Sequence, residues 1–564
     1  MILDSLTSEA QAGIRSRVRV LCEHLEISPY ESVDKHLILF LAEFEGKLKT
    51  LGVTESEEVG LFYLAVFGRY LTLQELEAVV HWVGVNKVSF SESVLFSDQM
   101  AKYLIERSKN IELFSPDLDC VLVDISHTYE YSKVTGIQRV VRQFVGEWTK
   151  SKVKFKLFRF DERANAPVLL SGDQFEFFLL NQKKVENNGF FNRVFIKIYR
   201  LFYEVLKIFY QLATLPLRFN LLGSNLSLKI FNLVNLIKNK VIATIACYCW
   251  GRNLKNFDHR KIPIFFQRKV FQPELVAERS RGDFYLAAWQ QSRFSLTLIG
   301  YDLIPIYNPE HCVVSADFLF YLRLLRIAEK VSCISADVAR QFVNFSANVI
   351  RLNSTDLVIG AHELSGDVWG DVQTAGSSIQ KSVPMVLCVG TIESRKNHLN
   401  ILRAAEILWK RGLVFELVFA GNLGWLNGPV IEEMRRIQAA GYFFSFILSP
   451  SDRVLQDLYR QCAFTVFCSL SEGYGLPIVE SLSFGKPCIT SSLGCMLDIA
   501  KGGGCELVDP YSSIQIAEKM QLLLTDFRHL TQLKSEIRLR LRRTWADYAS
   551  EVFDFTVGRK QTRV

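Results

Sequence analysis

The sequence lacks the cysteine and histidine spacing of a zinc site. Its twelve cysteines are spread over 564 residues, only Cys247 and Cys249 lie close together, and no Cys-x-x-Cys pair occurs. Cys388 and Cys468 stand in short apolar runs of the kind that form buried strands. We therefore expect reduced, buried thiols and no metal site.

The sequence also lacks the marks of a secreted or disordered chain. The first residues, Met-Ile-Leu-Asp-Ser-Leu-Thr-Ser-Glu, do not have the basic-then-apolar layout of a signal peptide. Hydrophobic residues make up 49% and charged residues 22%, which is an ordinary globular balance. A cytoplasmic location follows as an expectation, while 42 phenylalanines suggest contact with a membrane.

The chain is too long for one hydrophobic core, so several domains are expected. Residues 1–110 have apolar side chains at helical spacing, for example Leu37, Phe40, Leu41 and Phe44. We interpret this region as a helical accessory domain that serves self-association or binds a protein partner. From residue 120 onward strands and helices alternate, which predicts parallel α/β sheets.

Residues 187–257 interrupt the alternation. They contain ten basic residues, interleaved with phenylalanines and tyrosines, and a single acid, Glu204. Such a composition can bind nucleic acid, contact a protein, or form interfacial helices on anionic lipid. Its apolar richness favours lipid, and its apolar run at 241–250 is too short to span a bilayer. We predict a peripheral membrane contact and no nucleic-acid partner.

Two aspartates, Asp117 and Asp119, form an Asp-x-Asp before the strand predicted at 120–125. This spacing can bind a metal ion in some enzymes. Here we interpret it as a linker turn.

The most informative string is Ser-Glu-Gly-Tyr-Gly-Leu-Pro-Ile-Val-Glu at 471–480. Pro477 suits the first turn of a helix, so Gly473 and Gly475 form a turn that presents backbone N–H groups and a positive helix end, which suit a diphosphate. Two carboxylates, Glu472 and Glu480, flank this turn and suit sugar and ribose hydroxyls. Two glutamates eight positions apart also arise by chance, so the whole string carries the prediction of a nucleotide-sugar site.

Matching loops follow two other predicted strands. The strand at 385–389 ends in Gly390, and Arg395 and Lys396 follow just before a helix, where the helix dipole disfavours cations unless an anion binds. The strand at 417–420 ends in Gly421 and Asn422. Ligands bind at such carboxyl ends in open α/β sheets. Gly136, before another helix, fits a phosphate loop or a plain turn equally well.

These stretches resemble the retaining, GT-B-fold glycosyltransferases of family four, a class that includes sucrose synthases and bacterial mannosyltransferases. The matching residues are 389–397, 419–421 and 471–480, extended by 485–487 and 508–510. The resemblance covers about residues 120–186 and 285–550 and implies two Rossmann-like domains that face a cleft. The predicted domains are thus the helical 1–110, an N-terminal acceptor domain 115–368 with the insertion 187–257, a donor-binding domain 382–540, and a tail 541–564 that crosses back.

The resemblance implies roles for individual residues. Glu480 would accept hydrogen bonds from ribose hydroxyls, and Glu472 would hold a donor-sugar hydroxyl beside the anomeric carbon. Arg395 and Lys396 would neutralise the leaving diphosphate. The predicted catalytic residues are Glu472, Arg395 and Lys396; the predicted donor-binding residues are Glu480, Gly473, Tyr474, Gly475, Leu476, Gly390, Gly421 and Asn422. No metal or other cofactor is implied beyond the nucleotide-sugar substrate.

Two positions depart from the family pattern. Thr391 stands where many relatives have arginine, and Arg395 could substitute for it. Tyr301, followed by Asp302, stands where many relatives have histidine. Tyr301 could bind the donor sugar or pack at a strand end. Gly136, Tyr301 and Asp302 are the predicted first-domain residues of the cleft.

The resulting hypothesis is a cytoplasmic hexosyltransferase on the inner face of the cell membrane. It would move a mannose-type sugar from a nucleotide diphosphate to a growing, lipid-linked glycan of a surface polysaccharide or O-antigen. Two alternatives stay open at this point: a catalytically silent GT-B membrane scaffold of a glycan-assembly complex, and a GT-B sugar-nucleotide epimerase.

Overall fold

The computed structural model describes most of the chain, and these residues divide into two compact units. The described ranges are 6–27, 37–86, 99–130, 136–162, 166–180, 260–311, 316–350, 357–366 and 383–558. The first unit comprises 1–116, 157–266 and 287–293, and the second comprises 117–156, 267–286 and 294–564. The predicted membrane-binding insertion 187–257 lies outside the described residues.

The first unit begins with a group of helices, as the sequence predicts. They are α1 (Ser8–His24), α2 (Leu37–Thr50), α3 (Glu55–Phe67), α4 (Leu73–Asn86) and α6 (Gln99–Arg107). Thr54 and Glu57 form a capping box that satisfies the first N–H groups of α3. The guanidinium of buried Arg17 donates hydrogen bonds to the carbonyls of Ala65, Val66 and Ser108. These bonds tie the end of α3 to the end of α6.

The same unit contains a short parallel pair of strands, β1 (Glu112–Phe114) and β5 (Lys261–Pro263). Tyr70, from the helical region, donates a hydrogen bond to the carbonyl of Pro263 at 3.1 Å. Gln291 binds both the N–H and the carbonyl of Leu71, each at 2.9 Å. The helical region is therefore bonded to the strand-bearing part of its own unit.

The first large sheet has seven strands in the order β4-β3-β2-β6-β7-β8-β9. Its strands are β2 (Val121–Asp124), β3 (Phe155–Asp161), β4 (Ala166–Leu169), β6 (Lys269–Gln272), β7 (Ser295–Gly300), β8 (Ala328–Cys333) and β9 (Val358–Ala361). Strands β2, β6, β7, β8 and β9 pair in parallel, whereas β3 and β4 pair antiparallel at one edge.

The helical segments along this part of the chain follow the predicted alternation. They are α7 (Ser126–Glu130), α8 (Gly136–Lys150), α9 (Gly172–Leu180), α12 (Arg279–Ser292), α13 (Ile304–Tyr307), η3 (Pro309–His311), α14 (Ala316–Arg323), η4 (Leu324–Arg326), α15 (Ala336–Phe345) and η5 (Ser346–Ile350).

The second sheet has six parallel strands in the order β12-β11-β10-β13-β14-β15. Its strands are β10 (Met385–Val389), β11 (Glu416–Gly421), β12 (Phe444–Leu448), β13 (Phe464–Phe467), β14 (Cys488–Ser491) and β15 (Cys505–Val508). The intervening and following helices are η6 (Ser394–Lys396), α16 (His398–Lys410), α17 (Gly428–Ala439), α18 (Asp452–Gln461), α19 (Leu476–Ser483), α20 (Gly494–Ala500), α21 (Ser513–Thr525), α22 (Phe527–Leu539) and α23 (Trp545–Val557).

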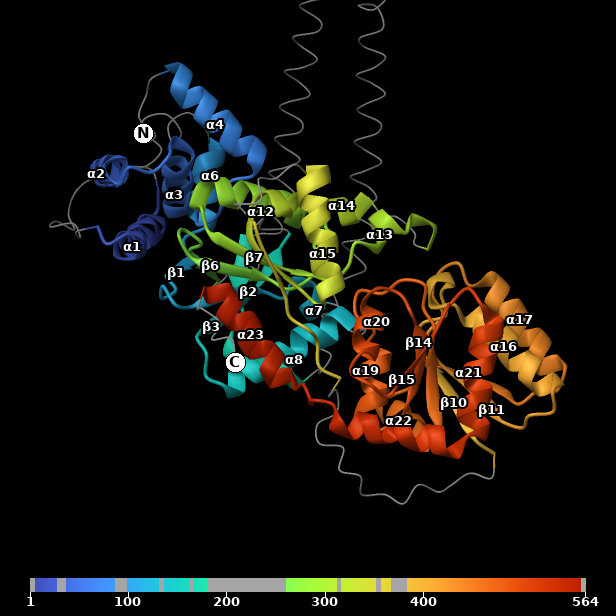
Figure 1. Cartoon of the computed structure of the whole chain (residues 1–564). Helices are drawn as coiled ribbons and strands as arrows, with labels where there is room; N and C mark the ends of the chain where they lie inside the picture. The colour runs from blue at the N-terminus through green and yellow to red at the C-terminus, as the bar shows by residue number, and fades with distance from the viewer. Residues whose placement is uncertain are drawn as a thin grey trace, which may run out of the picture. The chain divides into compact units, whose positions relative to one another are not determined.

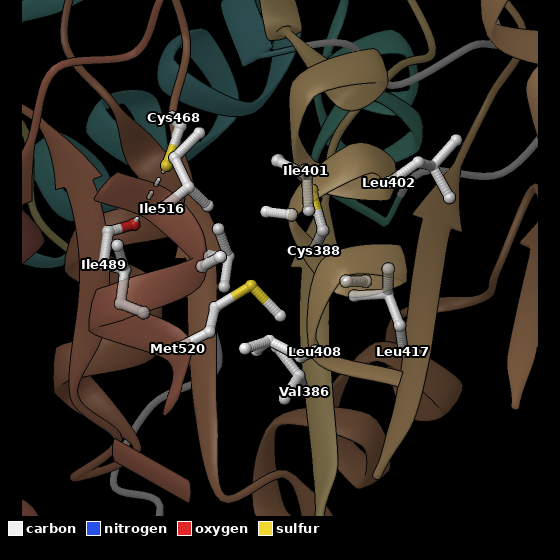
Figure 2. Packing of buried hydrophobic residues seen from close by; sticks show 14 of the residues in the cluster. Val386, Cys388, Ile401, Leu402, Leu408, Leu417, Cys468, Ile489, Ile516 and Met520 are labelled. Carbon is white, nitrogen blue, oxygen red and sulfur yellow. Dashed lines mark hydrogen bonds between the residues drawn. The ribbon is translucent and has the colours of Figure 1, made fainter. Parts of the chain in front are cut away.

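Successive side chains of each strand point to opposite faces of the second sheet, and both faces are buried. On one face, Val386 and Cys388 of β10 pack with residues of α16 and α21, including Leu408 and Met520 (Figure 2). Met385 and its neighbours face a second, smaller core with α18. In Figure 1, α16, α17 and α21 lie on one side of the strands and α19 and α20 on the other.

The last helix, α23, packs on the first sheet's helix α8. Trp148 of α8 donates a hydrogen bond from Nε1 to the carbonyl of Ala549 at 2.7 Å, and its ring meets that of Phe553 edge to face. Lys330 of β8 donates to the carbonyls of Phe555 and Thr556 at the end of α23. Helix α23 therefore contacts both a helix and a strand of the first sheet.

The prediction of two Rossmann-like sheets preceded by helices, which is the GT-B composition, is confirmed. The nine described cysteines that the structure records are all free thiols. In the described ranges, no helix combines the length and apolar character needed to cross a bilayer.

Candidate functional site

Three loops meet at the carboxyl edge of the second sheet. They follow the neighbouring strands β11, β10 and β13. Ile392, after β10, donates its N–H to the carbonyl of Asn422, after β11, at 2.7 Å. Leu470, after β13, donates its N–H to the carbonyl of Arg395 at 2.9 Å. Backbone bonds therefore join all three loops, and the predicted residues on them are brought together.

The centre of this edge is an ion cluster around Glu472. Lys396 Nζ lies 2.6 Å from Glu472 Oε1, and Arg395 Nη1 lies 2.7 Å from Glu472 Oε2. Arg395 also donates to the carbonyl of Ser471 at 2.7 Å and lies 3.4 Å from Glu393. The two motifs that the sequence places 76 positions apart are thus one cluster.

The local charges set the protonation of this cluster. Burial alone would raise the pKa of Glu472, but Arg395 and Lys396 outweigh it and lower that pKa to about 2. Burial lowers the pKa of Lys396, against the opposing effect of Glu472. Burial also acts to lower the pKa of Arg395, yet Glu472 and Glu393 raise it above its usual value. Glu472 is therefore an anion that two cations hold at neutral pH.

Asn397 holds the cluster's loop in place, although the sequence did not single it out for this role. It adopts a left-handed conformation, with φ 60°, between η6 and α16. Its side-chain amide donates to the carbonyls of Cys468 at 2.9 Å and Pro510 at 2.7 Å. Asn tolerates this conformation better than most residues, which is the signal that could have identified it.

Glu480 lies in α19, where the sequence places it, and is almost fully buried. Tyr459 donates its hydroxyl to Glu480 Oε2 at 2.8 Å, and Arg139 Nη1 lies 2.9 Å from Oε1. Burial raises the pKa of Glu480 while Arg139 acts to lower it. Arg139 and Tyr459 are two contacts of the predicted ribose residue that sequence reasoning missed.

The glycine turn before α19 has the predicted form. Gly475 is the N-cap residue with φ 111°, a conformation that favours glycine, and Pro477 follows in the first helical turn. Gly473 lies close to the backbone of Tyr301, because a Cβ at that position would be 2.2 Å from its carbonyl oxygen. Tyr474 is buried and donates its hydroxyl to the carbonyl of Leu364 at 2.6 Å.

The strand-exit residues after β10 and β11 also lie against one another. A Cβ on Gly421 would be 1.9 Å from the carbonyl oxygen of Gly390, so only glycine fits there. Asn422 accepts a hydrogen bond from the hydroxyl of Ser449 at 2.6 Å. These residues shape the backbone of the edge.

The first-sheet residues predicted for the cleft differ in what they contact. Tyr301 is buried and donates its hydroxyl to the carbonyl of Pro273 at 2.7 Å, as a packed aromatic at a strand end does. Asp302 accepts the N–H of Ile304. Burial raises the pKa of Asp302 above its usual value, although Arg395 acts to lower it. Gly136 begins α8, and a Cβ there would be 3.9 Å from Leu476.

A second charged cluster lies at the carboxyl ends of β2 and β6 in the first sheet. Arg281 lies 2.9 Å from Asp124 and 2.8 Å from Glu274. Tyr285 donates its hydroxyl to Asp124 at 2.6 Å. Backbone N–H groups of residues 126–128 donate to both carboxylates. We call this group the Arg281 cluster.

The Asp-x-Asp of the sequence, Asp117 and Asp119, lies in the turn before β2. Lys154 Nζ lies 3.4 Å from Asp117 and 3.1 Å from Asp119. Across the described ranges, no group of three or more histidine, cysteine, aspartate or glutamate residues has a metal-binding arrangement.

The Glu472 cluster can bind an anion and a polar, hydroxyl-bearing group side by side. Arg395 offers a planar fork of donors to phosphate oxygens, and Lys396 adds a point charge. Glu472 and Glu480 offer carboxylate oxygens that accept bonds from hydroxyls. Such a set suits a diphosphate that carries sugars at its ends.

Comparisons with known proteins identify what the second sheet resembles. Residues 372–540 match the family described as "Glycosyl transferases group 1". The chain is 27% identical over 215 residues to the serotype-specific mannosyltransferase WbdA of Escherichia coli, covering 36% of this chain and 26% of WbdA. It is 30% identical over 125 residues to the O-antigen chain mannosyltransferase B of the same organism, covering 22% of this chain and 32% of that protein.

The chain therefore spans about a quarter to a third of the length of these curated relatives. Among solved structures, Anabaena HepE in complex with UDP and glucose is similar at 14% identity, with a TM-score of 0.44. That similarity covers 77% of this chain and 94% of the HepE chain.

Proposed function

We propose, on the premise that residues 372–540 belong to the glycosyl transferases group 1 family, that this chain is a retaining, nucleotide-sugar-dependent hexosyltransferase. The observation that carries the proposal is the Glu472 cluster. Glu472 lies 2.7 Å from Arg395 and 2.6 Å from Lys396, which belong to another loop at the same carboxyl edge. Ligands of open α/β sheets bind at this edge.

In the proposed reaction, Arg395 and Lys396 stabilise the charge that develops on the leaving diphosphate. Preorganised cations act strongly here because they are held in place before the reaction begins. Glu472 holds a hydroxyl of the donor sugar and faces the positive charge that develops at the anomeric carbon. The departing phosphate accepts the proton of the acceptor hydroxyl, so the new bond forms on the same face of the sugar.

Glu480 accepts hydrogen bonds from the ribose in this proposal. Glu480 lies in the middle of α19, the helix that follows the turn of residues 473–475. Tyr459 orients the carboxylate through its 2.8 Å bond, so the ribose meets an acceptor of fixed direction. This arrangement separates the two glutamates into a sugar residue and a ribose residue.

The donor sugar is proposed to be of the mannose type, and the acceptor a growing, lipid-linked glycan. The support is the similarity to two proteins whose names state that they are mannosyltransferases, one serotype-specific and one of an O-antigen chain. We further propose a cytoplasmic location on the inner face of the cell membrane through residues 187–257. Residues 1–110 would then serve a protein partner or self-association.

The test is calorimetry of the purified full chain with a panel of nucleotide sugars, followed by transfer assays with the donor that binds. Glu480→Ala should weaken nucleotide binding, whereas Glu472→Ala should abolish transfer and leave much of the binding. Normal transfer by both variants would show that the site is wrong. Binding of none of the donors would favour the silent scaffold.

A further inference from the structure

Ser335 joins the first sheet to the glycine turn before α19. It follows β8 and is the N-cap residue of α15, where its hydroxyl oxygen accepts the N–H of Val338 at 3.1 Å. The same hydroxyl donates to the carbonyl of Gly473 at 2.8 Å. A serine hydroxyl has one proton to donate, so the bond from Val338 fixes its oxygen and the bond to Gly473 uses its proton. Ser335 is buried, and both bonds are therefore shielded from bulk water.

The carbonyl that precedes Gly473 is also held by a side chain. The carbonyl oxygen of Glu472 accepts the thiol of Cys495, which is buried in the first turn of α20, and the sulfur and oxygen are 3.3 Å apart. A thiol is a weaker donor than a hydroxyl, so the bond from Ser335 is the stronger of the two. Side chains at the starts of α15 and α20 thus fix two successive carbonyls of the turn.

The N–H groups of the turn differ from its carbonyls. Gly473, Tyr474 and Gly475 are buried, and the N–H of none of them donates to another described residue. Buried N–H groups are almost always bonded in proteins, because an unmade bond costs the desolvation of the group. Successive backbone donors of this kind form an anion-binding concavity, which suits the oxygens of a phosphate.

The held carbonyl and the N–H that follows it are linked because a peptide group is planar. In a trans peptide the C=O and the N–H point in opposite directions. The carbonyl of Gly473 and the N–H of Tyr474 belong to one such peptide, so the bond from Ser335 fixes the direction of that N–H as well. Glycine on either side of Tyr474 leaves this backbone permissive, and without the bond the peptide could rotate.

We propose that Ser335 is a positioning residue of the donor site: it holds the Gly473 carbonyl and thereby aims the Tyr474 N–H at the diphosphate of the nucleotide sugar. This role rests on the proposed function, in which the glycine turn binds the diphosphate beside Arg395 and Lys396. Ser335 acts through the peptide that it holds and contacts no reacting atom. Its contribution is one donor that is in place before the ligand binds, so binding requires no reorganisation of that peptide.

The test is calorimetry of the full-length chain with inorganic pyrophosphate, a probe that carries the diphosphate without a sugar or a base. Ser335→Ala should bind pyrophosphate about fivefold more weakly than the unaltered chain, as the loss of one hydrogen bond does. Ser335→Gly should weaken binding equally while it preserves α15, because glycine replaces an N-cap serine at little cost. Ser335→Thr keeps the hydroxyl and should bind within about twofold of the unaltered chain.

Thr54→Ala is the matched control, since it removes an N-cap hydroxyl from α3 in the other unit and should bind pyrophosphate like the unaltered chain. Circular dichroism checks that each variant is folded. Three results would overturn the proposal. One is unchanged pyrophosphate binding by Ser335→Ala and Ser335→Gly. Another is equal weakening by Ser335→Thr, which would assign the effect to packing. The third is no binding of pyrophosphate by the unaltered chain.

Sugar transfer, measured in parallel, separates this role from the proposed function. Fivefold weaker pyrophosphate binding by Ser335→Ala, together with no transfer by the unaltered chain from any nucleotide sugar, would support the positioning role and contradict the transferase. Transfer by the unaltered chain, with pyrophosphate binding that does not depend on the Ser335 hydroxyl, would support the transferase and contradict the positioning role.

Discussion

Each of the two sheets has a cluster of arginine and carboxylate groups at its carboxyl edge, and the two clusters differ in burial. In the Arg281 cluster, the side chains of Arg281, Asp124 and Glu274 are at most 2% exposed. In the Glu472 cluster, the side chains of Arg395, Lys396 and Glu472 are 9 to 15% exposed. The charged side chains of the Arg281 cluster are almost inaccessible to solvent, whereas those of the Glu472 cluster are partly accessible.

The partners of the carboxylates differ in the same way. Asp124 and Glu274 accept backbone N–H groups of residues 126–128 as well as the guanidinium. Glu472 is held instead by two cationic side chains, those of Arg395 and Lys396. Carboxylates bound by fixed backbone stabilise a fold, whereas a carboxylate bound by side chains can serve a substrate. Burial and partner type, more than the residue types, distinguish the Arg281 cluster from the Glu472 cluster, for which we propose a role in sugar transfer.

The largest expected effect comes from disrupting the Arg281 cluster. Arg281→Met should lower the free energy of unfolding by about 3–5 kcal/mol, because it leaves two buried carboxylates without their cation. Urea denaturation of the full chain, followed by circular dichroism, measures this. Arg279→Met in the same helix is the control, since its side chain is 78% exposed and should matter by less than about 0.5 kcal/mol. Equal effects of the two substitutions would contradict the comparison.

A substitution in the Glu472 cluster should instead lower the rate of sugar transfer. Glu472→Gln should reduce transfer by about 10²–10³-fold, as the loss of one preorganised charge in a site does. Its cost in stability should be smaller, about 1–2 kcal/mol, because Arg395 keeps its bond to the carbonyl of Ser471. Steady-state transfer and thermal unfolding of one preparation check both effects. Glu518→Gln, at an exposed position of α21, should change neither.

The low pKa of Glu472 gives a smaller effect that depends on pH. Because its pKa is about 2 in the folded chain, below its value when unfolded, its stabilisation is complete above about pH 4.5 and is lost as pH falls through 2. The difference in unfolding free energy between the unaltered chain and Glu472→Gln should therefore be constant from neutral pH to pH 5. It should shrink by about 1–2 kcal/mol toward pH 2. A difference that grows on acidification would show that the carboxylate is not paired.

The smallest expected effect concerns Glu480, whose side chain is almost as deeply buried as that of Asp124. Arg139→Ala should weaken nucleotide binding by about fivefold and make it fall further at low pH, because burial then favours the protonated form of Glu480. Calorimetry at two pH values measures this, with Arg460→Ala on α18 as the control. Tighter binding by Arg139→Ala would show that Arg139 only occupies the place of the ribose.

The sequence predicted the second sheet well because its signals are local. Short apolar strands end in glycine-rich loops, and each loop carries its charged residues within a few positions. Arg395 and Glu472 were expected in one site because ligands bind at the carboxyl ends of the strands, but their direct ion pair was not predicted. The turn at Gly475 followed from glycine and proline spacing alone.

The missed contacts depend on chain segments that are far apart. Arg139 and Glu480 are 341 positions apart, and no local pattern in α8 indicates the pairing. Arg281 and Asp124 are 157 positions apart, and an arginine beside an aspartate at positions 279–283 reads as a solvated helix surface. Tyr459 looks like any aromatic of a helix facing the sheet. Long-range polar contacts of this kind arise from the packing of finished elements, which sequence periodicity does not encode.

The return of α23 to α8 has a consequence for how the chain is made. Trp148 and Ala549 are 401 positions apart, so the ribosome releases α8 long before the helix that covers it. Until then the aromatic face of α8, with Phe144 and Trp148, lacks its final partner, and such uncovered apolar surface invites aggregation. Truncation before residue 545 would make that interim state permanent. Helix α8 is thus translated long before the helix that completes its packing.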